Sequence, residues 1–204
     1  MAGATQAASG VEIELAEPTL SSLDQASVEA VLLIVSSDER PLQGLAGLCD
    51  WRLCGALSRT LEAGWFKGAA GEALLAPTHG RIPPRRIFAF GVGPRSGAAN
   101  ALPGALAKAT AALRLARVAS VALALPWPEL ALDRSLDLWL ECSAAAAKEL
   151  NVQGGPTRQL WLGDVRAMRR WIEDARARCP AWRLRDAERQ GPSPLPSRRE
   201  VLGS

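Results

Sequence analysis

The apolar residues of this chain follow two patterns, one typical of strands and one typical of helices. Residues 30–35 (AVLLIV) are apolar throughout, as in a strand that is covered on both faces of a sheet. Residues 11–15 (VEIEL) instead alternate apolar and polar side chains, the period of a half-buried strand. Residues 42–63 carry leucines at helical spacing and are followed by Gly64, so they predict one long helix.

Strand and helix patterns continue to alternate toward the C-terminus. Residues 73–76 and 86–90 predict two strands joined as a hairpin, because the connection between them contains Gly and several Pro. A helix is predicted from Asn100, or from the residues just before it, to about Arg117. The remaining predicted elements are a buried strand at 118–125, a helix at 132–150, a strand at 158–162, a helix that Asp164 caps and that runs to about 177, and a short strand at 182–184.

This alternation over residues 11–186 predicts one α/β domain. We expect a mixed, largely parallel sheet with helices on both faces. Residues 1–10 are small and polar, so they predict a flexible N-terminus. Residues 187–204 are rich in Pro, Ser and Arg and have little to bury, so we expect a disordered tail there.

Composition limits the protein class. A chain of 204 residues, of which 48% are hydrophobic, is long enough to bury a core. No apolar run approaches the roughly 18 residues that a membrane span needs, and the start MAGATQAASG lacks the basic and apolar regions of a secretory signal. We therefore expect a cytoplasmic protein without membrane contact.

The net charge of +3 comes mainly from arginines near the C-terminus. Four of them fall in or next to the last predicted helix: Arg166, Arg169, Arg170 and Arg176. Such residues are more often a solvated helix face than a nucleic-acid surface. Nucleic acid therefore stays an alternative partner and not the expected one.

Residues for catalysis or metal binding do not form a complete set in this sequence. The four cysteines, Cys49, Cys54, Cys142 and Cys179, have no C-x-x-C spacing, so buried or reduced thiols are expected and a zinc site is not. The single histidine, His79, falls in a predicted turn with no nucleophile motif around it, which favours a structural role over that of a general base. We predict no catalytic residue, no metal ligand and no cofactor, and hence no enzyme activity.

A family resemblance lies in the middle of the chain. Residues 55–93 read GALSRTLEAGWFKGAAGEALLAPTHGRIPPRRIFAFGVG. This stretch resembles the N-terminal domain of the leucyl aminopeptidase family (peptidase family M17), which has the same order of a helix ending in Gly, an F-x-G and G-E pair, a strand, a Gly-containing turn and an apolar strand ending in G-x-G. Less specific similarity extends over residues 31–50 and 101–125. The resemblance implies a macro-domain-like three-layer sandwich.

The physical content of this motif is mostly structural. Gly64, Gly68 and Gly71 suit turns with positive φ, which side chains with a Cβ resist. Trp65 and Phe66 are expected to seal the preceding helix onto the sheet. For Glu72, which can accept hydrogen bonds from backbone amides or pair with Lys67, a solvated carboxylate is the favoured interpretation.

The resemblance also implies a second, C-terminal domain that holds two metal ions between carboxylates and a lysine. No segment of this chain resembles the N-T-D-A-E-G-R block that supplies metal ligands there. Two-metal peptide hydrolysis is therefore not carried over to this chain. The favoured function is a non-catalytic interaction or regulatory domain that acts through contacts with a protein partner or by self-association.

A ligand-binding alternative rests on Gly91, Gly93, Arg95 and Gly97. This loop joins an apolar strand to a helix, where backbone amides and the helix dipole favour anions. Its G-x-G-x-x-x-G spacing misses the dinucleotide fingerprint by one residue, and Pro94 removes one amide. Because the family's domain is similar in fold to macro domains, which bind ADP-ribose, the alternative is a nucleotide or ADP-ribose pocket with residues 36–44 as the neighbouring loop.

Tryptophan supplies a third candidate. The chain has seven Trp and no Tyr, and Trp is enriched in protein interfaces. Core packing is the expected role for most of them, and any that are exposed would mark a partner surface. Those considered are Trp127, Trp139, Trp161, Trp171 and Trp182, together with the helix predicted at 42–63.

Overall fold

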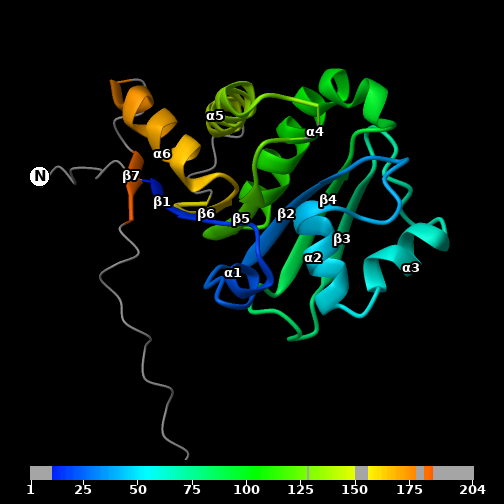
Figure 1. The fold of residues 1–204 in the computed structure, drawn as a ribbon. Helices are drawn as coiled ribbons and strands as arrows, with labels where there is room; N and C mark the ends of the chain where they lie inside the picture. Colours follow the sequence, from blue (N-terminus) through cyan, green and yellow to red (C-terminus); the bar gives the residue numbers. More distant parts are fainter. Residues whose placement is uncertain (1–10, 128, 150–155, 178–181, 186–204) are drawn as a thin grey trace, which may run out of the picture.

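The residues that the structure describes form a central seven-stranded sheet, in the order β3-β4-β2-β5-β6-β1-β7 (Figure 1). The computed structural model describes residues 11–127, 129–149, 156–177 and 182–185. The flexible segment predicted at 1–10 and the tail predicted at 187–204 lie outside the described residues. The strands are β1 (Val11–Ala16), β2 (Ala30–Val35), β3 (Ala73–Pro77), β4 (Arg86–Gly91), β5 (Ser120–Ala124), β6 (Arg158–Leu162) and β7 (Trp182–Leu184).

The pairing of these strands confirms the predicted mixed, largely parallel sheet. Strands β3 and β4 pair antiparallel, as the hairpin prediction requires, and the other neighbours pair parallel. Strand β2, whose residues are all buried, lies between β4 and β5. Its unbroken apolar sequence is therefore that of a central strand, covered on both faces.

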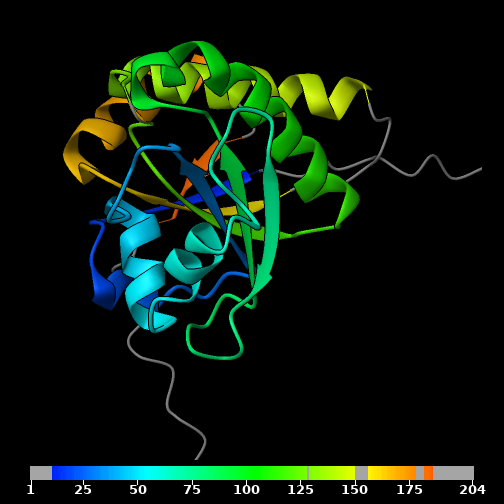
Figure 2. The same ribbon diagram turned by 90° about the vertical axis from the view of Figure 1, so that its right-hand side faces the viewer.

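Helices cover both faces of the sheet (Figure 2). One face carries α1 (Leu20–Asp24), α2 (Gly44–Arg52) and α3 (Ala56–Glu62), and the other carries α4 (Arg95–Leu115), α5 (Leu132–Glu149) and α6 (Val165–Asp174) with a 3-10 turn at Ala175–Ala177. Among the described helices, none is long and apolar enough to cross a membrane. The predicted three-layer sandwich is confirmed.

Each face of the sheet has its own hydrophobic core. The core under α4, α5 and α6 contains Trp127, Trp139, Trp161 and Trp171, and Trp182 packs against it. The core under α1, α2 and α3 is built from smaller side chains such as Leu45, Leu57 and Leu61, with Phe66. The expectation that core packing explains most tryptophans is confirmed.

The prediction of one helix over residues 42–63 is wrong. The helix is divided into α2 and α3, because Cys54 and Gly55 both have positive φ, of 55° and 77°. The Asp50 carboxylate makes the break stable: its Oδ1 accepts hydrogen bonds from the amides of Leu57 (2.8 Å) and Ser58 (3.1 Å). These are amides of the first turn of α3, which have no partner within the helix.

The predicted start of the next helix is also wrong. Helix α4 begins at Arg95 and not near Asn100. Pro94, with φ of −65°, holds the N-cap position in an extended conformation, and the Asp38 carboxylate accepts the amide of Arg95 at 3.0 and 3.2 Å. A carboxylate from a distant loop thus supplies the helix cap that the local sequence does not.

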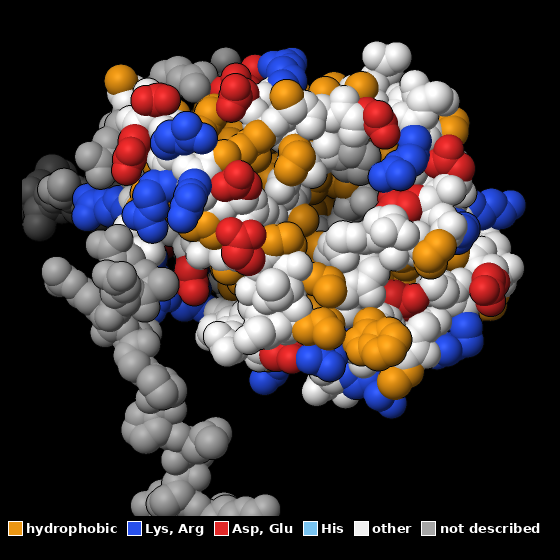
Figure 3. Space-filling model, viewed as in Figure 1, with side chains coloured by type: hydrophobic (Ala, Val, Ile, Leu, Met, Phe, Trp, Pro, Cys, Tyr) orange, Lys and Arg blue, Asp and Glu red, His pale blue; other side chains and the backbone are white. Residues whose placement is uncertain are grey.

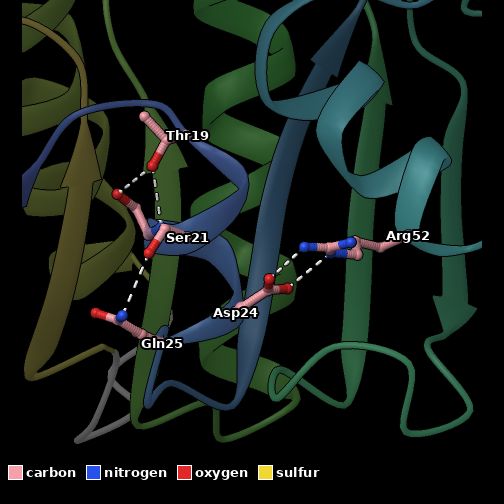
Figure 4. Close-up of polar contacts among 6 residues, drawn as sticks. Thr19, Ser21, Asp24, Gln25 and Arg52 are labelled. Atoms are coloured by element: carbon pink, nitrogen blue, oxygen red, sulfur yellow. Dashed lines mark hydrogen bonds and ion pairs between the residues drawn. The ribbon is translucent and has the colours of Figure 1, made fainter.

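Side-chain contacts join α1 to α2 (Figure 4). Thr19 caps α1 by accepting the amide of Ser22. The Asp24 carboxylate at the end of α1 accepts two hydrogen bonds from the guanidinium of Arg52 at the end of α2, from Nε at 2.8 Å and from an Nη atom. The ion pair fixes the C-terminal end of α2 relative to the C-terminal end of α1.

Candidate functional site

The glycines that carry the family resemblance form a close backbone crossing at the end of β4. A Cβ on Gly91 would lie 2.2 Å from the carbonyl oxygen of Ala69, so only glycine fits there. Gly93 donates its amide to the carbonyl of Gly68 at 2.9 Å and accepts the amide of Ser37 at 2.8 Å. The predicted positive φ at Gly64, Gly68 and Gly71 is confirmed.

The residues predicted to bind an anion have their amides engaged within the protein. The amide of Gly91 donates to the carbonyl of Glu72 at 3.0 Å, and that of Gly93 to Gly68. The amide of Arg95 donates to Asp38, and that of Gly97 to the carbonyl of Pro94 at 2.9 Å. Their role in ligand binding stays a prediction.

A crevice lies at the carboxyl ends of β2 and β5, where parallel sheets usually bind ligands. Its volume is about 230 Å³, below the roughly 300–1,000 Å³ of typical ligand pockets. A hollow near the centre of the view in Figure 3 opens above α2 in the same region. The crevice is lined mainly by apolar residues of β2 and α2, with Glu39, Gln43, Arg95 and Trp127.

Bulky and charged side chains fill part of this crevice. Trp127 is 3% exposed, and its indole nitrogen has no hydrogen-bond partner among the described residues. Glu39 is buried and accepts the amide of Gln43 at 2.8 Å. The Arg95 guanidinium lies 3.8 Å from the Glu129 carboxylate. An anionic ligand would therefore meet the carboxylate of Glu39 in the crevice, and those of Asp38 and Glu129 beside the single arginine, Arg95.

The outer side of α2 offers a different surface, which we call the α2 face. It is a hollow of about 640 Å³ formed by Pro41, Leu42, Gly47, Asp50, Trp51, Cys54 and Gly55. Figure 3 shows hydrophobic side chains gathered over the lower end of α2. Trp51 is 72% exposed. A large apolar ring in solvent, next to a hollow, is typical of a contact surface.

Two predictions for the motif after α3 are wrong and one is confirmed. Trp65 does not seal a helix, because it is 86% exposed, whereas Phe66 is buried as expected. The chain turns at Gly64, whose φ is +74°, and of the two rings that follow it Phe66 is the one that packs into the core. Glu72 is not a solvated carboxylate: it is half-buried and accepts the amides of Lys67 and Ala69 at 2.7 and 3.1 Å.

The other candidate residues are scattered. His79 is an exposed turn residue with φ of 52°. Within the described ranges the cysteines are free thiols, with Cys49 buried, Cys54 exposed and Cys142 half-buried, and no group of His, Cys, Asp or Glu there is placed to hold a metal ion. We find no catalytic constellation in the part of the chain that the structure describes.

The arginines of α6 lie on one exposed side of that helix. Arg166, Arg169 and Arg170 are exposed, and so are Glu173 and Asp174 at the end of the same helix. The side chain of Arg176 lies outside the described residues. The exposed side of α6 is thus basic along the first two turns of the helix and acidic along its last turn.

Sequence reasoning missed the two residues that shape these surfaces, Trp51 and Asp38. Trp51 is six positions from the buried Leu45, which places it away from the buried side of α2 at 3.6 residues per turn. That signal could have been used if the helix break had been known. Asp38 had no local signal, because it caps a helix that begins 57 residues later.

Comparison with known proteins agrees with this fold. Residues 20–151 match the sequence profile described as "Cytosol aminopeptidase family, N-terminal domain". A search of curated proteins finds no significant match.

Solved structures show the same architecture. A mutant of tomato leucine aminopeptidase is 18% identical, with a TM-score of 0.58 over 83% of this chain and 36% of the tomato chain. This chain therefore spans about a third of that enzyme's length. A macrodomain mutant from Oceanobacillus iheyensis is 11% identical, with a TM-score of 0.59 over 81% of this chain and 92% of its own. A Trypanosoma brucei macrodomain in complex with ADP-ribose is 15% identical, with a TM-score of 0.60 over 80% and 68% of the two chains.

Proposed function

We propose a function from the premise that this chain belongs to the cytosol aminopeptidase family, whose N-terminal domain it matches. The chain acts as a non-catalytic interaction domain through protein contacts. The observation that supports this function most directly is Trp51, 72% exposed on the α2 face. The family match covers the N-terminal domain and not the catalytic half. A cytoplasmic location fits a family described as cytosol aminopeptidases.

The α2 face has the properties of a binding centre. A Trp side chain buries about 150–250 Å² when a partner covers it, and Trp is the residue type most enriched among those that dominate binding energy. Next to Trp51 lie Pro41 and Leu42, which are apolar, and Asp50, whose carboxylate is already hydrogen-bonded to α3. A partner would thus cover apolar surface beside a carboxylate that already has hydrogen-bond partners.

The partner that the family suggests is an aminopeptidase of the same family, bound in a mixed assembly. We would mix the purified chain with such an enzyme from the source organism and measure co-sedimentation by analytical ultracentrifugation. Trp51→Ser should raise the Kd roughly 10- to 30-fold, as loss of a central Trp usually does. Leu115→Ser is the matched control, because Leu115 is 66% exposed on α4, on the other side of the sheet. Equal binding by the Trp51 variant, or no complex with the unaltered chain, would contradict the proposal.

An alternative function is binding of a nucleotide or ADP-ribose at the crevice, with contributions from Gly91, Gly93, Arg95 and Gly97. It is supported by the fold shared with a macrodomain that binds ADP-ribose and by the unpartnered indole N–H of Trp127. Asp38 opposes it, since its carboxylate occupies the start of α4 where a phosphate would lie. Under this alternative, calorimetric titration with ADP-ribose should show binding that Asp38→Ala strengthens. No heat of binding with either protein would exclude it.

Nucleic acid is the least supported partner. Arg166, Arg169 and Arg170 give α6 a basic start, but Glu173 and Asp174 follow on the exposed end of the helix. If nucleic acid binds there, its affinity should fall steeply as salt rises.

A further inference from the structure

Strand β3 is an edge strand with one unpaired side. Among the residues that the structure describes, it pairs with β4 alone and lies at one end of the sheet, whereas β7 lies at the other end (Figure 1). Hydrogen bonds at its two ends show which groups face β4. The amide of Gly91 donates to the carbonyl of Glu72, and the amide of Thr78 donates to the carbonyl of Arg85.

Residues alternate in direction along an antiparallel pair. Since Glu72 and Thr78 face β4, so do Leu74 and Ala76, in register with Ala89 and Ile87. The amide and carbonyl groups of Ala73 and Leu75 therefore point away from the sheet. Pro77 adds an outward carbonyl and has no N–H to leave unsatisfied.

This edge lacks the usual protection against pairing. Edge strands are generally protected by charges, by a central proline, by a bulge or by being very short. Strand β3 (ALLAP) has no charged residue, and its proline is at the end. Leu75 is 60% exposed, on the same side of the sheet as its partner Phe88, which is buried. The opposite edge, β7, is three residues long and includes the exposed Arg183.

We propose that the β3 edge pairs with the β3 edge of a second copy of this chain, antiparallel, about a twofold axis at Leu75. The edge is self-complementary about that residue. The Leu75 amide of each copy would donate to the Leu75 carbonyl of the other, and the Ala73 amide to the Pro77 carbonyl. The two Leu75 side chains would lie opposite one another on the same face. Because Pro77 has no N–H, the carbonyl of Ala73 in the other copy receives no hydrogen bond from it. The other hydrogen bonds of the pairing are unaffected.

The test is the mass of the purified chain in solution, measured by sedimentation equilibrium over a wide range of concentration. We expect the mass to rise from 21.6 kDa toward twice that value. Leu75→Arg should raise the dissociation constant about 10-fold or more, since it places like charges opposite one another and removes the apolar contact. Leu115→Arg is the matched control and should associate like the unaltered chain, because Leu115 is an equally exposed leucine away from β3.

A second variant keeps the proposal testable if Leu75→Arg fails to fold. Ala73→Pro removes an outward N–H at the first residue of the strand, where proline is tolerated, and leaves the bonds to β4 intact. It should also weaken association while keeping the melting temperature. A chain that stays at 21.6 kDa at every concentration, or a Leu75→Arg and Ala73→Pro pair that associates unchanged, would overturn the proposal. Trp51→Ser should not alter this dimer, so failure here is distinct from failure of the α2 face.

Discussion

On the α4, α5 and α6 side of the sheet tryptophan fills the core, whereas on the α1, α2 and α3 side tryptophan lies in solvent. Trp139 and Trp161 are 1% and 0% exposed, and both indole N–H groups donate to Gln159. Trp51 and Trp65 are 72% and 86% exposed. The comparison shows that the same residue type serves packing on one face and is available for contact on the other.

The difference follows from what each layer must fill. Helices α4 and α5, of 21 and 18 residues, cross the sheet over a wide span, and large rings fill the space beneath them. Helices α2 and α3, of nine and seven residues, are held close to the sheet by leucine and alanine. The one large ring among the described residues of this core is that of Phe66, whereas Trp51 and Trp65 lie outside it.

The largest expected effect is the contrast between a core and a surface tryptophan. Trp161→Ala should lower the free energy of unfolding by about 3–5 kcal/mol, because it leaves a cavity and removes the N–H that donates to Gln159 at 2.9 Å. Trp51→Ala should change it by less than about 0.5 kcal/mol. Urea denaturation followed by circular dichroism measures both values. Similar losses for the two variants would mean that Trp51 is also a packing residue.

A smaller effect is expected at the break between α2 and α3. Asp50→Ala removes the acceptor for the amides of Leu57 and Ser58 and should cost about 1–2 kcal/mol, as the loss of a helix cap does. Asp50→Asn keeps a side-chain oxygen and should cost less. Thermal melting of the three proteins checks this order, and an unchanged Asp50→Ala protein would show that α3 does not depend on this cap.

The smallest effect concerns chemistry and leaves stability unchanged. Burial raises the pKa of the Cys49 thiol to about 12, so this thiol stays protonated near pH 8, where the thiolate is the reactive form. Cys54 is exposed on the α2 face. Iodoacetamide labelling followed by peptide mass spectrometry should therefore modify Cys54 well before Cys49. Equal labelling would mean that α2 opens readily in solution.

The raised pKa of Cys49 also sets a direction for stability against pH. Because the pKa of the Cys49 thiol is higher in the folded protein, the protonated thiol contributes to the stability of the folded state in full below the unfolded pKa, near 9.0. This contribution is lost as the pH rises toward 12. Replacing Cys49 with Ala should flatten the decline of stability in that range. A decline of the same steepness in the variant would assign it to other groups.

The sequence predicted the sheet better than the helix boundaries. The apolar run of β2 and the hairpin of β3 and β4 depend on neighbouring residues, so their patterns are visible in the sequence. The start of α4 depends on Asp38 and the start of α3 on Asp50. Caps supplied from outside the helix leave no local pattern, so both boundaries were predicted wrongly.

The candidate surface was less visible than the fold. The loop at Gly91 and Gly93 lies between a strand and a helix, where an anion site is expected, but its amides are used in the backbone crossing with Gly68 and Glu72. Trp51 falls within the helix predicted over residues 42–63, and its exposure became clear only with the structure of α2. A motif shows which residue types are present, whereas burial and partners decide their role.

The most direct test of the α2 face against the crevice is hydrogen exchange, measured by mass spectrometry on the chain alone and on the chain mixed with an aminopeptidase of its family. We expect exchange to slow in peptides covering residues 41–55, around Trp51, and to stay unchanged in peptides covering residues 91–97. Slower exchange confined to residues 91–97, with residues 41–55 unaffected, would contradict the assignment of the contact surface to α2.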